Sequence, residues 1–297
     1  MDSLLKKYGY FPDNEKINRS LEMIASGLDN LVSEQVLKDC FSMMDLTSLK
    51  TEDTKTSIAK LVRKVNDLNR SYPDVPLPAS VCVYPDFASV VRDERASDGL
   101  HATVVAACFP SSQSFLEVKL RECELAVENG ADEVDIVLAL SSFLDGDEAA
   151  ASEEIRRIRE CIDNAAARQG RKVILKVILE TGLLMTLDAI AEASFLAMEA
   201  GADFIKTSTG KVSVNATPAA AYVMCECIAA YHKAMGKKVG FKPAGGISTA
   251  MDAVSYHAIV SAVLGREWLN KNLFRLGVSR LANSILSALE QKTVTYF

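Results

Sequence analysis

The sequence has little of what metal centres, disulfide-rich folds and membrane proteins require. Its three histidines stand apart, without the spacing of metal ligands. Its seven cysteines form an odd, scattered set without a CxxC pair, so reduced and mostly buried thiols are expected. The longest uncharged apolar stretches, such as residues 136–144, are far shorter than the roughly 18 residues of a membrane span. We therefore expect no metal, no disulfide framework and no membrane span.

Targeting signals and excess positive charge are also missing. The N-terminus lacks the apolar core and small-residue cleavage site of a secretory signal, so we expect a cytoplasmic protein. With 39 acidic against 33 basic residues, the net charge of −6 leaves no basic footprint for nucleic acid or an anionic membrane surface. An anionic ligand would therefore have to be met by local groups.

The chain alternates between short β-rich runs and helical patterns. Residues 1–40 predict helices, with Leu21, Ile24 and Leu28 at helical spacing and no strand signal. From residue 41, eight β-rich runs are each followed by a helical pattern, near 41–46, 80–84, 101–107, 133–138, 172–179, 203–207, 238–242 and 273–277. Eight strands separated by helices predict an all-parallel sheet closed into a (β/α)8 TIM barrel. We expect a helical extension over residues 1–40 and a catalytic barrel domain over residues 41–297.

Two lysines lie in apolar strands that open into glycine-containing loops. Lys206 follows Phe204 and Ile205, and Lys242 follows Phe241. For either lysine alone, a snorkelled or ion-paired side chain is the ordinary explanation. On neighbouring strands six and seven, however, the two ammonium groups would disfavour each other's charge, and burial would add to this effect. A neutral lysine amine at such a place attacks carbonyl groups and forms a Schiff base.

Two carboxylates are predicted to face the same interior. Strand alternation puts Asp135 on the face of Glu133 and Val137. Asp135 could be a counter-charge to the lysines or a proton shuttle for carbon–carbon cleavage, and the residues leave both roles open. Asp45 is the second inward carboxylate, because an apolar first strand tolerates an unpaired carboxylate poorly.

Three loops at strand ends suggest a phosphate site. They are Thr209-Gly210-Lys211, Gly245-Gly246 and the segment from Gly277 to Arg280. Barrels often bind phosphate after strands seven and eight, where backbone amides and helix N-termini meet. Each loop alone could equally be an ordinary turn, and the Gly-Lys pair lacks the earlier glycine that a Walker loop requires.

In this order, the motifs resemble those of the class I, Schiff-base family of 2-deoxyribose-5-phosphate aldolases over residues 41–290. The segments that carry the resemblance are Met44–Thr47, Cys82–Pro85, Gly130–Asp135, Phe204–Lys211 and Gly240–Gly246. The resemblance implies a lyase that needs no metal or cofactor and reversibly cleaves 2-deoxy-D-ribose 5-phosphate to acetaldehyde and D-glyceraldehyde 3-phosphate. A phosphosugar would be its small-molecule partner, and a barrel of this kind is expected to form a homo-oligomer.

The same resemblance implies a role for individual side chains. Lys206 would form the Schiff base, Lys242 would activate it, and Asp135 would relay protons. The supporting network would consist of Asp45, Thr207 and Lys176. The residues toward the phosphate would be Thr209, Gly210, Lys211, Gly245, Gly246 and Ser279.

The chain departs from the family pattern at three places. Ser248 stands where the family often has arginine, and Arg280 stands where it often has serine or threonine. We hypothesise that Arg280 supplies the positive charge that is missing at Ser248. The family often ends in a tyrosine that reaches the site, whereas this chain ends Tyr296-Phe297, for which a disordered tail is the first expectation.

Two alternatives stay open at the level of the sequence. A barrel fold does not fix the substrate, so another Schiff-base lyase acting on phosphosugars is one alternative. The other is a catalytically silent barrel that binds phosphosugars or acts through its N-terminal helices.

Overall fold

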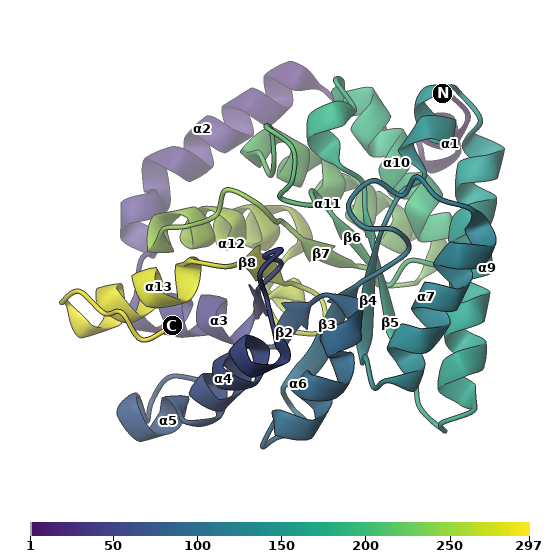
Figure 1. The fold of residues 1–297 in the computed structure, drawn as a ribbon. Coiled ribbons are helices and arrows are strands. Elements are labelled where there is room, and N and C mark those ends of the chain that lie inside the picture. The colour runs from purple at the N-terminus through teal and green to yellow at the C-terminus, as the bar shows by residue number, and fades with distance from the viewer. Residues whose placement is uncertain (1) are drawn as a thin grey trace.

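Eight parallel strands form a barrel in the computed structural model, which describes residues 2–297, with side chains from residue 4 onward (Figure 1). The strands are β1 Met44–Thr47, β2 Ser80–Val83, β3 His101–Val105, β4 Glu133–Val137, β5 Ile174–Ile178, β6 Phe204–Lys206, β7 Gly240–Lys242 and β8 Leu276–Val278. Hydrogen-bonded neighbours run in the order β7-β6-β5-β4-β3-β2-β1-β8. Bridges from Phe241 to Phe274 and from Ala244 to Gly277 join the two outer strands. The predicted (β/α)8 TIM barrel is confirmed.

Helices surround this barrel (Figure 1). They are α1 Asp2–Tyr8, α2 Asn14–Leu31, α3 Glu34–Ser42, α4 Lys55–Asn66, α5 Leu68–Ser71, α6 Ala88–Glu94, α7 Leu116–Glu128, α8 Leu140–Leu144, α9 Glu148–Ala167, α10 Leu187–Glu199, α11 Pro218–Met235, α12 Ala250–Leu264 and α13 Leu281–Glu290. Within residues 2–297, none of them has the length and apolar character needed to cross a membrane.

The sequence begins several of these helices with threonine. The side chains of Thr54, Thr186, Thr217 and Thr249 each accept a hydrogen bond from a backbone N–H of the following first turn. Such caps satisfy donors that the helix itself leaves unpaired. The caps therefore fix where α4, α10, α11 and α12 begin, and so limit the length of the loops before them.

The first and last predicted strands were misplaced by a few residues. Phe41 and Ser42 belong to α3, and β1 begins at Met44. Phe41 is fully buried as a helix residue, so its apolar neighbourhood resembled the start of a strand. Strand β8 covers residues 276–278 rather than 273–277, and Phe274 contributes only an isolated bridge.

The N-terminal helices pack on the outside of the barrel's helical layer. Tyr8 of α1 stacks on Phe195 of α10, with ring centroids 4.4 Å apart. Helix α2 lies against α11 and α12 and buries Ile17, which is 1% exposed, while α3 contacts α12 and α13 (Figure 1). The division of the chain into an extension and a barrel domain at residue 40 stays a prediction.

The C-terminal tail is held in place. The Tyr296 ring lies edge-on to Tyr72, and its hydroxyl donates to the Lys64 carbonyl at 2.8 Å. The backbone N–H groups of Tyr296 and Phe297 both donate to Asn283 Oδ1. The expectation of a disordered tail was therefore wrong, because these contacts dock it between α4 and α13.

Packing of α2 makes a stability prediction. Ile17→Ala should lower the free energy of unfolding by about 2–4 kcal/mol, because it leaves a cavity beneath α2. Met23→Ala on the same helix is the control, since Met23 is 75% exposed, and should change stability by less than about 0.5 kcal/mol. Urea unfolding followed through the single, buried Trp268 measures both. Equal effects of the two variants would contradict the packing of α2.

Candidate active site

Seven charged side chains meet inside the barrel, and we call them the ion cluster. They are Asp45, Glu133, Asp135, Lys176, Lys206, Lys242 and Arg275. Lys206 is 4% exposed and the other six are fully buried. Buried charges persist only when they are paired and hydrogen-bonded, and each member of the cluster has at least one partner of opposite charge.

Asp135 joins both predicted catalytic lysines. Its Oδ2 atom accepts hydrogen bonds from Lys206 Nζ and from Lys242 Nζ, each at 2.8 Å. Its Oδ1 atom accepts from Lys176 Nζ at 3.0 Å. Asp45 Oδ2 lies 2.5 Å from Lys242 Nζ and 3.3 Å from Lys176 Nζ. The structure thus brings together all the predicted ionic members of the site.

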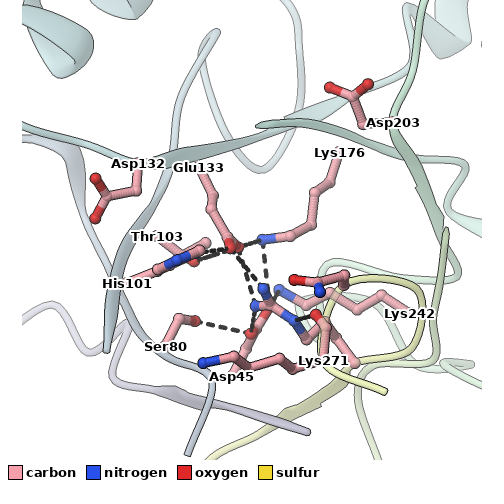
Figure 2. Close-up of polar contacts among 12 residues, drawn as sticks. Asp45, Ser80, His101, Thr103, Asp132, Glu133, Lys176, Asp203, Lys242 and Lys271 are labelled. Atoms are coloured by element: carbon pink, nitrogen blue, oxygen red, sulfur yellow. Dashed lines mark hydrogen bonds and ion pairs between the residues drawn. The ribbon is translucent and has the colours of Figure 1, made fainter. Parts of the chain in front are cut away.

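Strand register explains this convergence. Lys206 and Lys242 are partners in the β6–β7 ladder, and Asp135 and Lys176 are partners in the β4–β5 ladder. Residues at equal height on neighbouring strands place their side chains side by side. Asp132, which precedes β4, points away from the cluster in Figure 2, and its carboxylate accepts from the Ala102 N–H. The predicted alternation along β4 is therefore confirmed.

A glycine makes room for one lysine. Gly277 of β8 lies beside the stem of Lys242, and a Cβ atom at residue 277 would stand 3.0 Å from Lys242 Cε and 2.7 Å from Ala244 Cβ. Both separations are below normal van der Waals contact. Any larger residue would therefore require Ala244, and to a smaller extent the stem of Lys242, to shift.

The surroundings shift the pKa values of the two lysines in opposite directions. Burial lowers the pKa of Lys206, and the nearby charge of Lys242 lowers it further, against the pull of Asp135. Burial also acts to lower the pKa of Lys242, but Asp135 and Asp45 outweigh it and raise the pKa above its ordinary value. Lys206 is thus the lysine poised to lose its proton.

The carboxylates show the complementary behaviour. Burial alone would raise the pKa of Asp135, but Lys176, Lys206 and Lys242 outweigh it and hold that pKa well below its ordinary value. Asp45 is lowered in the same way, against burial, by Lys176, Lys242 and Arg275. Both carboxylates are therefore ionised at neutral pH and can accept a proton only when the charges around them change.

A cavity of about 310 Å³ opens above Lys206, at the C-terminal ends of the strands. Its lining contains Lys206, every residue predicted to lie toward a phosphate (Thr209, Gly210, Lys211, Gly245, Gly246, Ser279 and Arg280), and also Thr47, Ser48, Leu49, Lys50, Ala244, Gly277 and Val278. Lys206 is the one member of the ion cluster among these lining residues. Active sites of (β/α)8 barrels lie at this face.

The lining loops are fixed by buried polar contacts. The carboxylate of Glu180 accepts from both the backbone N–H and the hydroxyl of Thr209. The Thr207 hydroxyl accepts from the Ala244 N–H at 2.9 Å, so Thr207 ties the ends of β6 and β7 together. Within the described residues, the Thr207 hydroxyl forms its hydrogen bonds with the Ala244 backbone and not with the ion cluster. Gly245 has φ +80°, and a Cβ there would meet Asn215 at 2.6 Å.

Of the three positions at which the chain departs from the family pattern, one lines the cavity and two do not. Arg280 lines the cavity, whereas Ser248 is not among its lining residues and donates its N–H to Asp252. Tyr296 is docked on α4, also outside the lining.

The sequence did not reveal three parts of the site: the loop after β1, including Lys50, and the buried residues Glu180 and Arg275. Arg275 stands between Phe274 and Leu276, the same signal that drew attention to the two lysines.

A lysine that lines a cavity at the C-terminal face of a (β/α)8 barrel, with a pKa lowered by burial, is the arrangement that an enzyme acting on carbonyl compounds requires. The model of the DeoC/LacD family of aldolases matches residues 40–271. The chain is 40% identical over 279 residues to a Caenorhabditis elegans protein assigned as a deoxyribose-phosphate aldolase, covering 93% of this chain and 89% of that one. It is 41% identical to the human deoxyribose-phosphate aldolase over 82% of this chain and 77% of the human one.

Solved structures share the fold. The structure of a tetrameric deoxyribose phosphate aldolase from Aeropyrum pernix matches with a TM-score of 0.66 and 24% identity, over 93% of this chain and 98% of that one. The chain therefore belongs to the deoxyribose-phosphate aldolase family, and it is an aldolase, a carbon–carbon lyase. The resemblance read from the motifs is confirmed.

The lowered pKa of Lys206 makes a prediction about stability. Because its folded pKa lies below the unfolded value, the unfolded state holds the extra proton, so Lys206 destabilises the fold at low pH and ceases to do so as pH rises through the unfolded pKa. Lys206→Met should therefore raise the free energy of unfolding by about 1 kcal/mol at pH 6, with the gain shrinking toward pH 10. Urea unfolding at both pH values tests this. A variant less stable than the wild type at pH 6 would contradict it.

Proposed function

We propose that the protein reversibly cleaves 2-deoxy-D-ribose 5-phosphate to acetaldehyde and D-glyceraldehyde 3-phosphate through a Schiff base on Lys206. The observation that carries the proposal is the position of Lys206, which contacts the buried Asp135 on one side and lines the cavity on the other. Its lowered pKa supplies the neutral amine that the first step needs. Membership of the aldolase family supports the same reaction.

The first half of the proposed reaction builds the Schiff base. The neutral Lys206 amine attacks the C1 aldehyde and gives a carbinolamine, which loses water to form an iminium ion. Loss of that water requires a proton donor, and Lys242 is proposed to supply the proton, because it shares the Asp135 carboxylate with Lys206.

The second half breaks the carbon–carbon bond. Asp135, directly or through water, takes the proton of the C3 hydroxyl as the C2–C3 bond breaks, and the bonding electrons move into the iminium. Glyceraldehyde 3-phosphate leaves, and an enamine stays on Lys206. Protonation at C2 and hydrolysis then release acetaldehyde and restore the amine. Asp45 and Lys176 are proposed to hold Asp135 and Lys242 in place, and Thr207 to hold the adjoining loop.

The phosphate is proposed to bind at the far end of the cavity. Thr209, Gly210, Lys211, Gly245, Gly246 and Ser279 would contribute backbone and side-chain donors there. Lys211 already spans the mouth, because its Nζ donates to the Leu49 carbonyl at 2.7 Å. Arg280 is exposed, and its side chain forms no ion pair or hydrogen bond with residues 4–297, so it is available for an anion. Arginine favours phosphate through paired N–H donors.

Two wider features belong to the proposal. The seven cysteines are free thiols, the state that a reducing compartment maintains. This supports a cytoplasmic site of deoxyribonucleotide catabolism.

Two apolar side chains at the start of α7 are exposed. Phe115, just before the helix, is 79% exposed, and Val118 within it is 54% exposed. Exposed apolar surface of this kind supports a homo-oligomer.

Trapping tests the Schiff base. Incubation with deoxyribose 5-phosphate and borohydride should give a reduced adduct on wild-type protein, mapped by intact mass and peptide mass to residue 206, and none on Lys206→Leu. Lys60→Leu, at an exposed lysine of α4 that does not line the cavity, is the matched control and should still form the adduct. An absent adduct on folded wild type would favour a silent phosphosugar-binding barrel. An adduct with other phosphosugars but not with this one would favour a different lyase.

Kinetics test the phosphate assignment of Arg280. Arg280→Ala should raise the KM for deoxyribose 5-phosphate by about tenfold and leave the KM for unphosphorylated 2-deoxyribose unchanged, because one charge-assisted contact is lost. Ser248→Ala, outside the cavity lining, is the control and should change neither value. If Arg280→Ala leaves both KM values as in wild type, the hypothesis that Arg280 replaces the arginine missing at Ser248 is wrong.

A further inference from the structure

Beneath the reacting lysines lies a second layer of charge that the proposed mechanism does not use. Arg275 immediately precedes β8 and is fully buried. Its guanidinium donates to Asp45 Oδ1 at 2.5 Å and to the two oxygens of Glu133 at 2.6 and 3.1 Å. Neither Arg275 nor Glu133 lines the cavity.

Glu133 is bound from every side. Lys176 forms an ion pair with its Oε2 atom, and the Thr103 hydroxyl donates to the same atom at 2.8 Å. His101 Nδ1 lies 2.6 Å from Oε1. Figure 2 shows Glu133 and Lys176 reaching toward each other, with Thr103 and His101 on the side of β3. So many contacts fix the carboxylate in one position, and with it the Lys176 ammonium.

Charge balance then singles out one lysine. The ion cluster holds four cationic groups and three carboxylates, so one positive charge is in excess when all are ionised. Lys176, Lys242 and Arg275 each contact at least two carboxylates. Lys206 contacts Asp135 alone within the described residues. The proton that is easiest to remove is therefore on Lys206.

Building on the proposed Schiff-base function, we propose that Arg275 and Glu133 are positioning residues whose opposite charges decide how readily Lys206, rather than Lys176 or Lys242, gives up its proton. They act through the shared carboxylate of Asp45 and the ammonium of Lys176. Neither contacts the substrate.

Strands β1 to β7 and the residue before β8 all contribute an ionisable group to this balance. The ionisable groups that face it are Asp45 of β1, Cys82 of β2, His101 of β3, Glu133 and Asp135 of β4, Lys176 of β5, Lys206 of β6, Lys242 of β7 and Arg275 before β8. Burial raises the pKa of the Cys82 thiol, so this group adds no charge at neutral pH.

The two positions carry opposite charges, so substitutions there predict opposite results. On the acid side of its pH profile, adduct formation slows as Lys206 becomes protonated, and we call this part of the profile the acid limb. Glu133→Gln removes a negative charge and should move the acid limb to lower pH by about one unit. Arg275→Met removes a positive charge and should move it to higher pH by a similar amount. The limb is measured as the rate of adduct formation with acetaldehyde and cyanoborohydride between pH 5 and 9, followed by intact mass. Acetaldehyde carries no phosphate, so neither the ionisation nor the binding of a phosphate group enters the profile.

Two further variants separate charge from structure. Arg275→Lys keeps the charge and should return the limb to within about 0.3 pH unit of wild type. Ser80→Ala removes a neutral donor to Asp45 Oδ1 and should leave the limb unchanged. Shifts of Glu133→Gln and Arg275→Met in the same direction, or no shift in either, would overturn the proposal.

Wild-type protein supplies a test that does not depend on the folding of any variant. Because the second layer is buried, its influence is not screened, and the acid limb should stay within about 0.2 pH unit between 50 and 500 mM salt. A larger drift would overturn the proposal by assigning the limb to surface charges. An absence of adduct at every pH would instead refute the proposed Schiff-base function itself, which distinguishes the two failures.

Discussion

The site depends on one carboxylate that is shared by three ammonium groups. Asp135 contacts Lys176, Lys206 and Lys242, and each contact comes from a different strand of the barrel. Removing these charges from water is costly, and the barrel recovers that cost only while its strands keep their register. The architecture and the chemistry therefore constrain each other: a register shift by one residue would turn the lysines outward and leave Asp135 buried without a partner.

Lys206 and Lys242 both contact Asp135 but differ in their other neighbours. Lys242 lies deep between Asp45 and Asp135 and stays charged, whereas Lys206 stands at the border between the ion cluster and the cavity. Two lysines at equal height on adjacent strands thus become an acid and a nucleophile, because they differ in their carboxylate partners and in their access to the cavity.

Much of this arrangement was readable from the sequence, for physical reasons that differ by residue. Strand alternation and apolar flanks identified Lys206, Lys242 and Asp135, because a charge in an apolar strand needs a partner. Short loops at strand ends gathered the predicted phosphate residues, since all such loops meet at one face. The contacts that could not be predicted are those between residues far apart in the sequence. Glu180 reaches Thr209 across 29 positions, and no local pattern announces such a pair. The start of β1 was misjudged because Phe41 is buried equally well as part of a helix.

The space kept by Gly277 has an evolutionary consequence. A side chain at residue 277 is excluded by the alanine methyl and the lysine stem that lie against it, so a change at residue 277 is expected only together with changes at residues 242 and 244. A lineage that abandoned the chemistry would have to shorten residue 242 and also remove the Ala244 methyl before position 277 could accept alanine or serine. In descendants of this barrel, the residue at 277 would preserve a record of whether the lysine beside it was still under selection.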